Sequence, residues 1–392
     1  MVVVYSLIIL IAKSICIFAC MKDIIELRRK LHSCAELSGK EYKTAGIISG
    51  FLEGCKPDQL IPVAETGLLA VYDSGVPGNT VLFRADTDAL PIEERNGFKY
   101  RSVNAGVSHK CGHDGHTAIL AGLAYHIAYN RPVRGRALLL FQPAEETGEG
   151  ALKAIREISG SKPDYAFAMH NLPGYELKSV VLKDGTFSAA SRGMTIELSG
   201  RSSHASEPEK GISPARALAS LISELPGLSH GDPVSDDYNM LTIVHCRLGD
   251  KAFGTSPGEA VLMVTLRGSS DEKIELLAHQ VNQLVAKYSS LDNLQFEISF
   301  SEIFPATINN PEASEIIRNA ALSAGMKVHD LTSPFRWSED FGHFSTISKS
   351  VLFGIGAGYD HLPLHNPGYD FPDEIIPSAT NLWVSVYERM LR

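Results

Sequence analysis

Hydrophobic residues in the first half of the chain follow two patterns, a helical spacing and short continuous runs. From Lys22 to about Leu52 apolar side chains recur every three or four residues, with a break near Ser38, which predicts two helices. Beyond them, apolar runs bounded by turn residues predict strands at Leu68–Tyr72, Val81–Phe83, Ala137–Phe141 and Tyr165–Met169, with helices at Thr117–Tyr129 and Ala151–Ile158. Since these strands are apolar on both faces, we expect an α/β fold, a mixed and largely parallel sheet flanked by helices.

The pattern changes at about Ser191. The order strand, helix, strand, strand, helix, strand follows, with the elements at Met194–Leu198, Pro214–Leu225, Leu241–Cys246, Ala260–Leu266, Glu272–Tyr288 and Gln295–Phe300. This order is that of a ferredoxin-like α+β domain. A helix at Glu312–Ala324 and a strand at Val351–Ile355 then indicate that the first domain resumes. We therefore predict a catalytic domain from residues 21–190 and 303–392, with residues 191–302 inserted as a second domain.

Residues 1–20 form an apolar segment with two interpretations. Lys13 interrupts the run and no basic region precedes it, so the segment is a poor export signal. Met21 opens the first amphipathic helix, and we favour it as the true start of the protein. A chain that starts there is expected to be cytoplasmic and to have no membrane partner. The alternative is a genuine leader that anchors or exports the chain.

Composition narrows the possible partners. A length of 392 residues suits two domains. The net charge is -9 and no Lys/Arg block is present, so we expect no nucleic acid partner. The six cysteines show no framework spacing, which argues against a disulfide scaffold and favours a reducing compartment.

The densest chemical signal is the segment Cys111-Gly112-His113-Asp114-Gly115-His116, directly before a predicted helix. Thiolate, imidazole and carboxylate are ligands of zinc and neighbouring first-row metals, and glycine lets the backbone turn tightly enough to direct several of them inward. The alternative is a polar loop in which Asp114 caps the helix.

Two adjacent carboxylates, Glu145 and Glu146, follow the predicted strand Ala137–Phe141. Open α/β sheets bind ligands at the carboxyl ends of their strands. One carboxylate there could bind a metal while the other takes a proton from a metal-activated water. A solvated Glu-Glu turn is the simpler alternative.

Further candidate residues follow other predicted strands. His170 ends the run Tyr165–Met169, and His365 comes after the strand Val351–Ile355. Four segments with metal-binding side chains at one sheet edge favour a metal centre. Asp86 also follows a strand, and we predict that it holds the far ring nitrogen of a ligating histidine. Its alternatives are a helix cap or a salt bridge to Arg84.

His204 lies in a serine-rich loop of the inserted domain. A histidine presented by a lid could donate a hydrogen bond to the oxyanion that develops when an amide is attacked. A surface histidine without a function is the alternative.

The motifs together resemble the aminoacylase-type dinuclear metallopeptidase family, in its amidohydrolase branch of hippurate hydrolases, N-acetyl-diaminopimelate deacetylases and auxin-conjugate hydrolases. The resemblance covers Met21 to Arg392 and rests on FRADTDALPIEE, HKCGHDGHTA, FQPAEETGEGA, AMHNLPG, SSHASEP and PLHNPGYDFPDE. Two departures stand out: Ala35 replaces the usual proline, and residues 253–258 lack the asparagine that many relatives carry in the lid.

The resemblance implies a phosphorylase/hydrolase-like catalytic domain and a lid that also forms a homodimer. It implies two divalent metal ions, whether zinc, manganese, nickel or cobalt, bound by Cys111, His113, Glu146, His170 and His365. It also implies Glu145 as general base, His204 as the residue that polarises the carbonyl, and Cys111 as a possible bridge between the ions. We therefore predict a metal-dependent amidohydrolase acting on N-acyl amino acids. The alternatives are a dipeptidase or aminopeptidase, and a non-catalytic metal-binding homologue.

Overall fold

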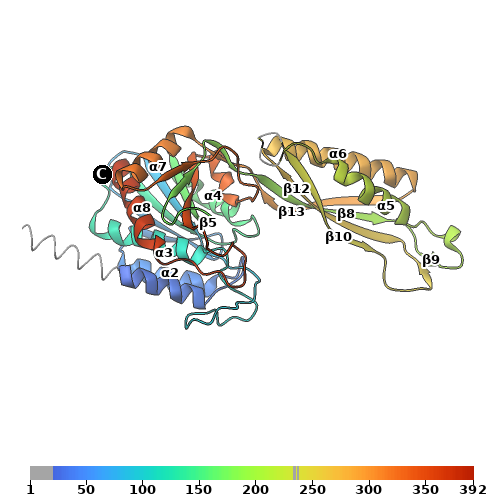
Figure 1. Ribbon diagram of the computed structural model, residues 1–392, viewed down its shortest axis with the longest axis horizontal. Coiled ribbons are helices and arrows are strands. Elements are labelled where there is room, and N and C mark those ends of the chain that lie inside the picture. Colours follow the sequence, from blue (N-terminus) through green and yellow to red (C-terminus); the bar gives the residue numbers. More distant parts are fainter. Residues whose placement is uncertain (1–20, 233–234, 236–237) are drawn as a thin grey trace, which may run out of the picture. The chain divides into compact units, whose positions relative to one another are not determined.

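The chain divides into two compact units. A computed structural model of the chain describes residues 21–232, 235 and 238–392, and Figure 1 labels its elements. Among these residues, the first unit comprises 21–185, 308–331 and 343–392, and the second comprises 186–307 and 332–342. The segment 1–20, for which we weighed a leader against a false start, lies outside the described residues.

The first unit is built on an eight-stranded sheet in the order β1-β2-β4-β3-β5-β16-β6-β15. The four strands β4, β3, β5 and β16 in the middle of this order run parallel to one another, while β1 and β2 pair antiparallel at one side. The strand bounds are β1 Gln59–Val63, β2 Gly67–Asp73, β3 Thr80–Asp86, β4 Arg136–Gln142, β5 Tyr165–Pro173, β6 Val180–Leu182, β15 Val328–Asp330 and β16 Lys349–Gly358. This sheet confirms the predicted mixed, largely parallel α/β fold.

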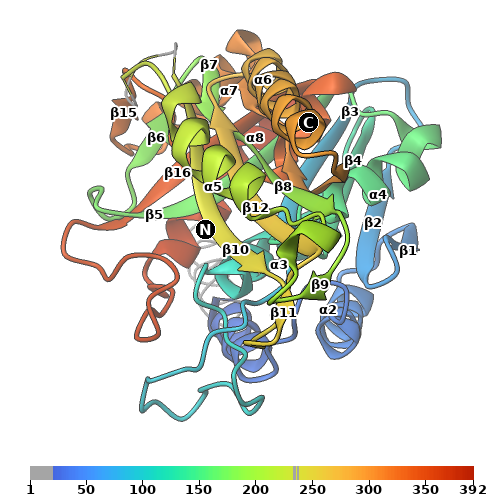
Figure 2. The same ribbon diagram turned by 90° about the vertical axis from the view of Figure 1, so that its right-hand side faces the viewer.

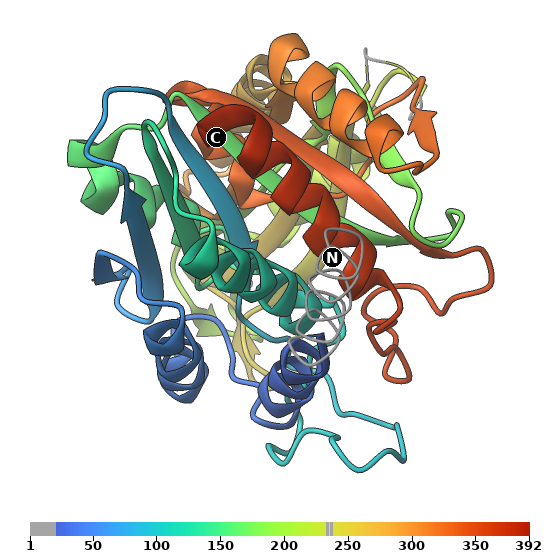
Figure 3. The same ribbon diagram turned by 90° about the vertical axis from the view of Figure 1, so that its left-hand side faces the viewer.

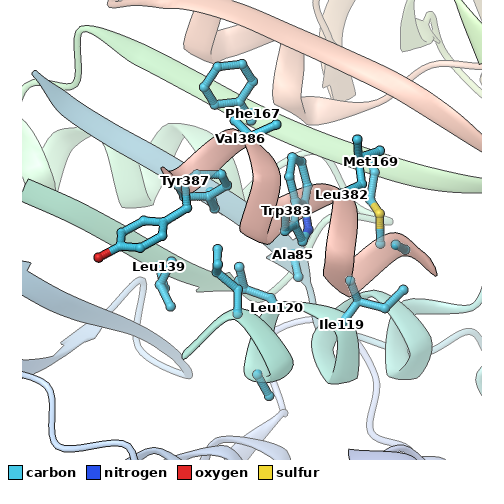
Figure 4. Packing of buried hydrophobic residues seen from close by; sticks show 14 of the residues in the cluster. Ala85, Ile119, Leu120, Leu139, Phe167, Met169, Leu382, Trp383, Val386 and Tyr387 are labelled. Carbon is cyan, nitrogen blue, oxygen red and sulfur yellow. The ribbon is translucent and has the colours of Figure 1, made fainter. Parts of the chain in front are cut away.

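Helices pack against this sheet and against one another. Residues 21–33 are helical, and the other helices of the unit are α2 Tyr42–Gly54, α3 His113–Tyr129, α4 Gly150–Glu157, α7 Pro311–Ser323 and α8 Ile375–Leu391. Helices α3 and α8 lie side by side, and both contact strand β4 (Figure 3). In the core beneath them, Trp383 of α8 meets the rings of Phe83 and Phe353 at 5.3 and 5.2 Å (Figure 4 labels Trp383 among its neighbours). The sequence pattern did not reveal α8.

The second unit contains a four-stranded antiparallel sheet in the order β10-β12-β8-β13. Its elements are β8 Ala190–Ser199, α5 Ala215–Glu224, β10 Asn239–Leu248, β12 Glu259–Gly268, α6 Asp271–Leu291 and β13 Gln295–Phe304. Helices α5 and α6 cover one face of this sheet (Figure 2), and a buried cluster that includes Leu221, Leu262 and Val281 fills the interface. Strand order and connectivity are those of the ferredoxin-like fold, as predicted.

The shorter elements complete the chain. They are strands β7 Gly185–Ser188, β9 Ser203–His204, β11 Thr255–Ser256 and β14 Thr307–Asn309, and 3-10 turns η1 Ile158–Ser161, η2 Pro208–Lys210, η3 Leu225–Leu228 and η4 Asp340–Thr346. No described helix is both long and apolar enough to cross a membrane.

The boundaries predicted for the inserted domain are too narrow. The second unit begins at Thr186 rather than 191, ends its main segment at Thr307 rather than 302, and includes residues 332–342, which we had assigned to the catalytic domain. Backbone pairing is the reason: the Phe335 N–H donates to the carbonyl of Phe187 at 2.7 Å, and the Ala189 N–H donates to the carbonyl of Phe335 at 3.0 Å. The rings of Phe187 and Trp337 also meet at 5.9 Å.

Candidate metal centre

The metal-binding side chains lie on four separate segments of the first unit. Cys111 precedes α3, and His113 is the first residue of that helix. Glu145 and Glu146 follow β4, His170 lies within β5, and His365 lies in the loop after β16. We had placed His170 just past its strand, but β5 continues to Pro173. Because β4, β5 and β16 are parallel, their carboxyl ends share one sheet edge, where open α/β folds bind ligands.

The five predicted ligands and the predicted base come together at this edge. The Cys111 Sγ lies 3.4 Å from the His170 Nε2, and the Glu146 Oε1 lies 3.8 Å from the His113 Nε2 and 3.9 Å from the His365 Nε2. The ligand atoms fall into overlapping groups whose members lie within 4.8 Å of one another: Cys111, His113 and His170; Cys111, Glu146 and His365; and His113, Glu145 and Glu146. Cys111, His113 and Glu146 each belong to two of these groups, so the groups form one continuous cluster.

Two buried atoms of this cluster show that its residues fit a cation. The Nε2 of His113 and the Oε1 of Glu146 are buried and have no hydrogen-bond partner among the described residues. Leaving a buried polar atom unpaired costs about 1–3 kcal/mol, and coordination to a metal removes that penalty. Thiolate, imidazole and carboxylate are also the donors that zinc and its first-row neighbours accept.

Burial and neighbouring charges together set the protonation of the cluster. Burial raises the pKa of Glu146 to about 7, and it raises the pKa of the Cys111 thiol well above its ordinary value. Burial and the neighbouring His116 lower the pKa of His170, which keeps that ring neutral. A cation would favour the thiolate and carboxylate, so its binding should release protons.

Hydrogen bonds fix both buried histidines among the predicted ligands with the same nitrogen directed at the cluster. The Nδ1 of His113 lies 3.0 Å from the Asp88 carbonyl oxygen and 3.2 Å from the Asp88 Oδ1. The Nδ1 of His170 lies 2.9 Å from the Asn171 carbonyl oxygen. Since carbonyl oxygens only accept, each Nδ1 carries the proton, and Nε2 is left to bind a metal.

We had predicted that Asp86 holds the far ring nitrogen of a ligating histidine. It contacts His116 instead, which is not one of the predicted ligands. Its Oδ1 lies 2.6 Å from the Nδ1 of His116, and its Oδ2 accepts from Arg84 at 2.7 Å. Although burial opposes it, His113, His116 and Arg84 hold the pKa of Asp86 well below its ordinary value. Asp88 has the predicted role instead, because its side chain reaches His113. Alternate residues of an extended segment share a face, so the Asp-Thr-Asp spacing made Asp88 as good a candidate as Asp86.

The tight turn before α3 depends on Gly112. This residue is the N-cap of α3 and has a φ of 99°, and a Cβ here would lie 2.4 Å from the Asn171 Oδ1. The alternative in which Asp114 caps the helix is therefore wrong. Asp114 is buried, and its Oδ2 accepts from Arg28 at 3.1 Å and lies 2.8 Å from the His32 Nδ1.

His204 lies in the second unit, on β9, and its side chain is exposed. Its Nδ1 accepts from the backbone N–H of Ser206 at 3.1 Å and lies 2.7 Å from the Ser206 Oγ. In the neutral ring the proton therefore sits on Nε2, which can donate a hydrogen bond.

Comparison with known proteins places the chain in a family. The sequence model of peptidase family M20/M25/M40 matches residues 82–389, which include all six residues of the cluster. The chain belongs to this family. It is therefore a hydrolase of family M20, which confirms the resemblance drawn from its motifs.

Proteins similar to this chain align with most of its length. An uncharacterized hydrolase of Staphylococcus saprophyticus is 32% identical over 384 residues, with 95% of this chain and 97% of the relative aligned. The solved structure of a protein named as an aminohydrolase, from methicillin-resistant Staphylococcus aureus, has a TM-score of 0.86 at 25% identity and covers 96% of this chain and 98% of its own. The YXEP protein of Bacillus subtilis, described as a dinuclear metal-binding peptidase of family M20, shares the fold with a TM-score of 0.79 at 24% identity, over 95% and 99% of the two chains.

Proposed function

We propose that this M20 hydrolase cleaves the amide bond of N-acyl amino acids, releasing a carboxylic acid and a free amino acid. The observation that carries the proposal is the pair of adjacent carboxylates, Glu145 and Glu146, beside the other ligands. Glu146 falls into a group with Cys111 and His365, while the Glu145 Oε2 lies 3.9 Å from the His113 Nε2. One carboxylate is thus available as a ligand and its neighbour as a base.

We propose that two divalent ions are held by Cys111, His113, Glu146, His170 and His365, with Cys111 shared between them. Such ions, when bound, polarise the amide carbonyl and lower the pKa of a water. Zinc, manganese, nickel and cobalt all suit this mixed donor set.

The residues of the chain then have distinct roles in the proposed reaction. Glu145 accepts a proton from the attacking water and returns it to the leaving amine, a function suited to a carboxylate next to the ligands. His204, with its proton on Nε2, donates a hydrogen bond to the oxyanion that develops on the carbonyl oxygen. Cleavage requires both proton transfers, because an unprotonated amide nitrogen is a poor leaving group.

A substrate panel tests this proposal against its alternatives. The chain is purified and loaded separately with manganese, zinc, nickel and cobalt, and amino-acid release is measured from N-acetyl, N-benzoyl and dipeptide substrates. We expect turnover of N-acyl amino acids to exceed that of dipeptides. Faster turnover of dipeptides would favour a dipeptidase or aminopeptidase, and no turnover with any metal would favour a non-catalytic homologue.

We also propose that the second unit forms a homodimer. Strand β13 is an edge of its sheet, and beside it lies a groove of about 330 Å³ lined by α6 and by Phe296, Ile298 and Phe300 of β13. An edge strand offers unpaired backbone groups to another strand, and exposed aromatic rings favour association.

A further inference from the structure

Lys110 is a fully buried lysine immediately before the ligand Cys111. Its ammonium donates to the Glu94 Oε1 at 2.6 Å and to the carbonyl oxygen of Tyr369 at 2.8 Å. Its own carbonyl oxygen accepts from the backbone N–H of His365 at 2.8 Å. A buried charge is tolerated only when it is paired and hydrogen-bonded, and here both conditions are met.

These contacts join two segments of the chain that carry metal ligands. One segment carries Cys111, and the other is the loop of residues 365–369, which begins with His365. Lys110 binds the start of this loop through its backbone and the end of it through its side chain. Lys110 therefore links the Cys111 segment to the His365 loop at two points, and the contact with Tyr369 is the one that requires the lysine side chain.

Glu94, which accepts the hydrogen bond from the Lys110 ammonium, is itself held in place by other contacts. Glu94 is 5% exposed, and its Oε1 also lies 2.9 Å from the His32 Nε2. His32 in turn lies 2.8 Å from the carboxylate of Asp114, which follows the ligand His113. Positive and negative side chains alternate along this buried network. Its two ends, Lys110 and Asp114, flank the Cys-Gly-His turn in the sequence.

We propose that Lys110 is a positioning residue that holds Cys111 and His365 at the separation that a shared metal ion requires. This inference rests on the two-metal part of the proposed function. His365 falls only into the metal-binding group with Cys111 and Glu146, whereas His170 falls only into the group with Cys111 and His113. Loss of the lysine contacts should therefore weaken one metal position more than the other.

Metal titration of the metal-free full chain tests the proposal. Cobalt is added to the wild-type chain and to Lys110→Met, and the binding isotherm and the thiolate-to-cobalt absorption are recorded. Methionine keeps an unbranched side chain, one atom shorter than that of lysine, but cannot donate to the Tyr369 carbonyl. We expect two binding steps in the wild type, one of which weakens 10- to 100-fold in the variant, while the other changes less than about threefold.

Two further variants keep the test decisive. Lys110→Met leaves the Glu94 carboxylate paired with His32 but without its ammonium partner, so the double variant Lys110→Met/Glu94→Gln neutralises that carboxylate and protects folding. It should still show the selective loss. The control is Lys153→Met, since Lys153 is an exposed lysine of α4 that pairs with Glu149 at 2.8 Å, and its isotherm should match the wild type.

Three results would overturn the proposal: a single binding step in the wild type, an equal loss in both steps, or an unchanged isotherm in the double variant. No substrate enters this measurement. A chain that binds two ions with the expected selectivity but hydrolyses no amide would reject the proposed function and leave the role of Lys110 intact.

Discussion

The carboxylate of Asp88 lies 3.2 Å from the Nδ1 of His113, while its second oxygen accepts the backbone N–H of Glu146 at 3.0 Å. One buried side chain thus orients two predicted ligands that come from different segments. Neighbours of this kind fix the ring and increase the basicity of a ligating histidine.

We predict that Asp88→Ala lowers metal affinity 10- to 100-fold, because the ring of His113 loses its carboxylate partner and the Glu146 backbone loses its acceptor. Metal content after dialysis against a graded chelator measures the change. The matched control is Ser38→Ala, which removes a 2.7 Å hydrogen bond to the same carboxylate but leaves both ligand contacts. Equal losses in the two variants would contradict the role of Asp88.

The case of Asp88 shows what sequence could and could not predict. The central strands were predictable because they are buried on both faces, and the ligand types were recognisable at the strand ends. Which aspartate meets which histidine depends on how β3 packs against α3, and sequence does not report that packing. Helix α8 was missed because β-branched residues such as Val384 and Val386 lower its helix propensity, which packing around Trp383 overrides.

For Glu145, we predict that Glu145→Gln retains the metal content of the wild type and loses turnover by about 10²- to 10⁴-fold. The amide has nearly the same shape but cannot accept the proton of the attacking water. Metal analysis and kcat, measured on the same preparation, separate the two effects. A variant with near-normal kcat would exclude Glu145 as the base, and parallel loss of metal would make it a ligand.

We expect His204 to affect the rate of hydrolysis and not the metal content of the protein. We predict that His204→Ala lowers kcat by about 10²- to 10³-fold, the usual effect of removing an oxyanion donor, with unchanged metal content. His230→Ala provides the control, since His230 is another exposed histidine of the second unit. If KM rises while kcat stays constant, His204 contributes to uniform binding of substrate rather than to the transition state.

The proposed dimer can be tested at its edge strand. We predict that the wild-type chain elutes with twice the 42.6 kDa mass of one chain, and that Phe296→Lys/Phe300→Lys converts it to a monomer, because paired lysines repel another strand edge. Light scattering after size-exclusion chromatography gives the mass. Val244→Lys/Leu248→Lys alters exposed residues of β10, the opposite edge of the same sheet, and should leave the dimer unchanged. Dissociation by the β10 variant instead would move the interface to that edge.

Buried charges should make the stability of the first unit depend on pH. Burial acts to lower the pKa of His32, but Asp114 and Glu94 contact its two ring nitrogens and raise that pKa to about 9. Since the folded-state pKa lies above the unfolded value of about 6.5, the stabilisation is complete below about pH 6.5 and is lost as the pH rises through about 9. Burial likewise acts to raise the pKa of Glu94, but His32 and Lys110 lower it to about 2. Its contribution is complete above about pH 4.5 and is lost as the pH falls toward 2.

Both contributions are therefore complete between about pH 4.5 and 6.5, and we predict that the wild type loses about 3 kcal/mol more than His32→Gln between pH 6 and pH 9. Urea unfolding of the metal-free chain measures this difference. The chain has two tryptophans, so the Trp337→Phe background leaves the fluorescence of Trp383, in the core of the first unit, as the reporter. Since Trp383 reports the unit that contains His32, equal pH dependence in the two chains would mean that His32 is not held as an imidazolium by its carboxylates.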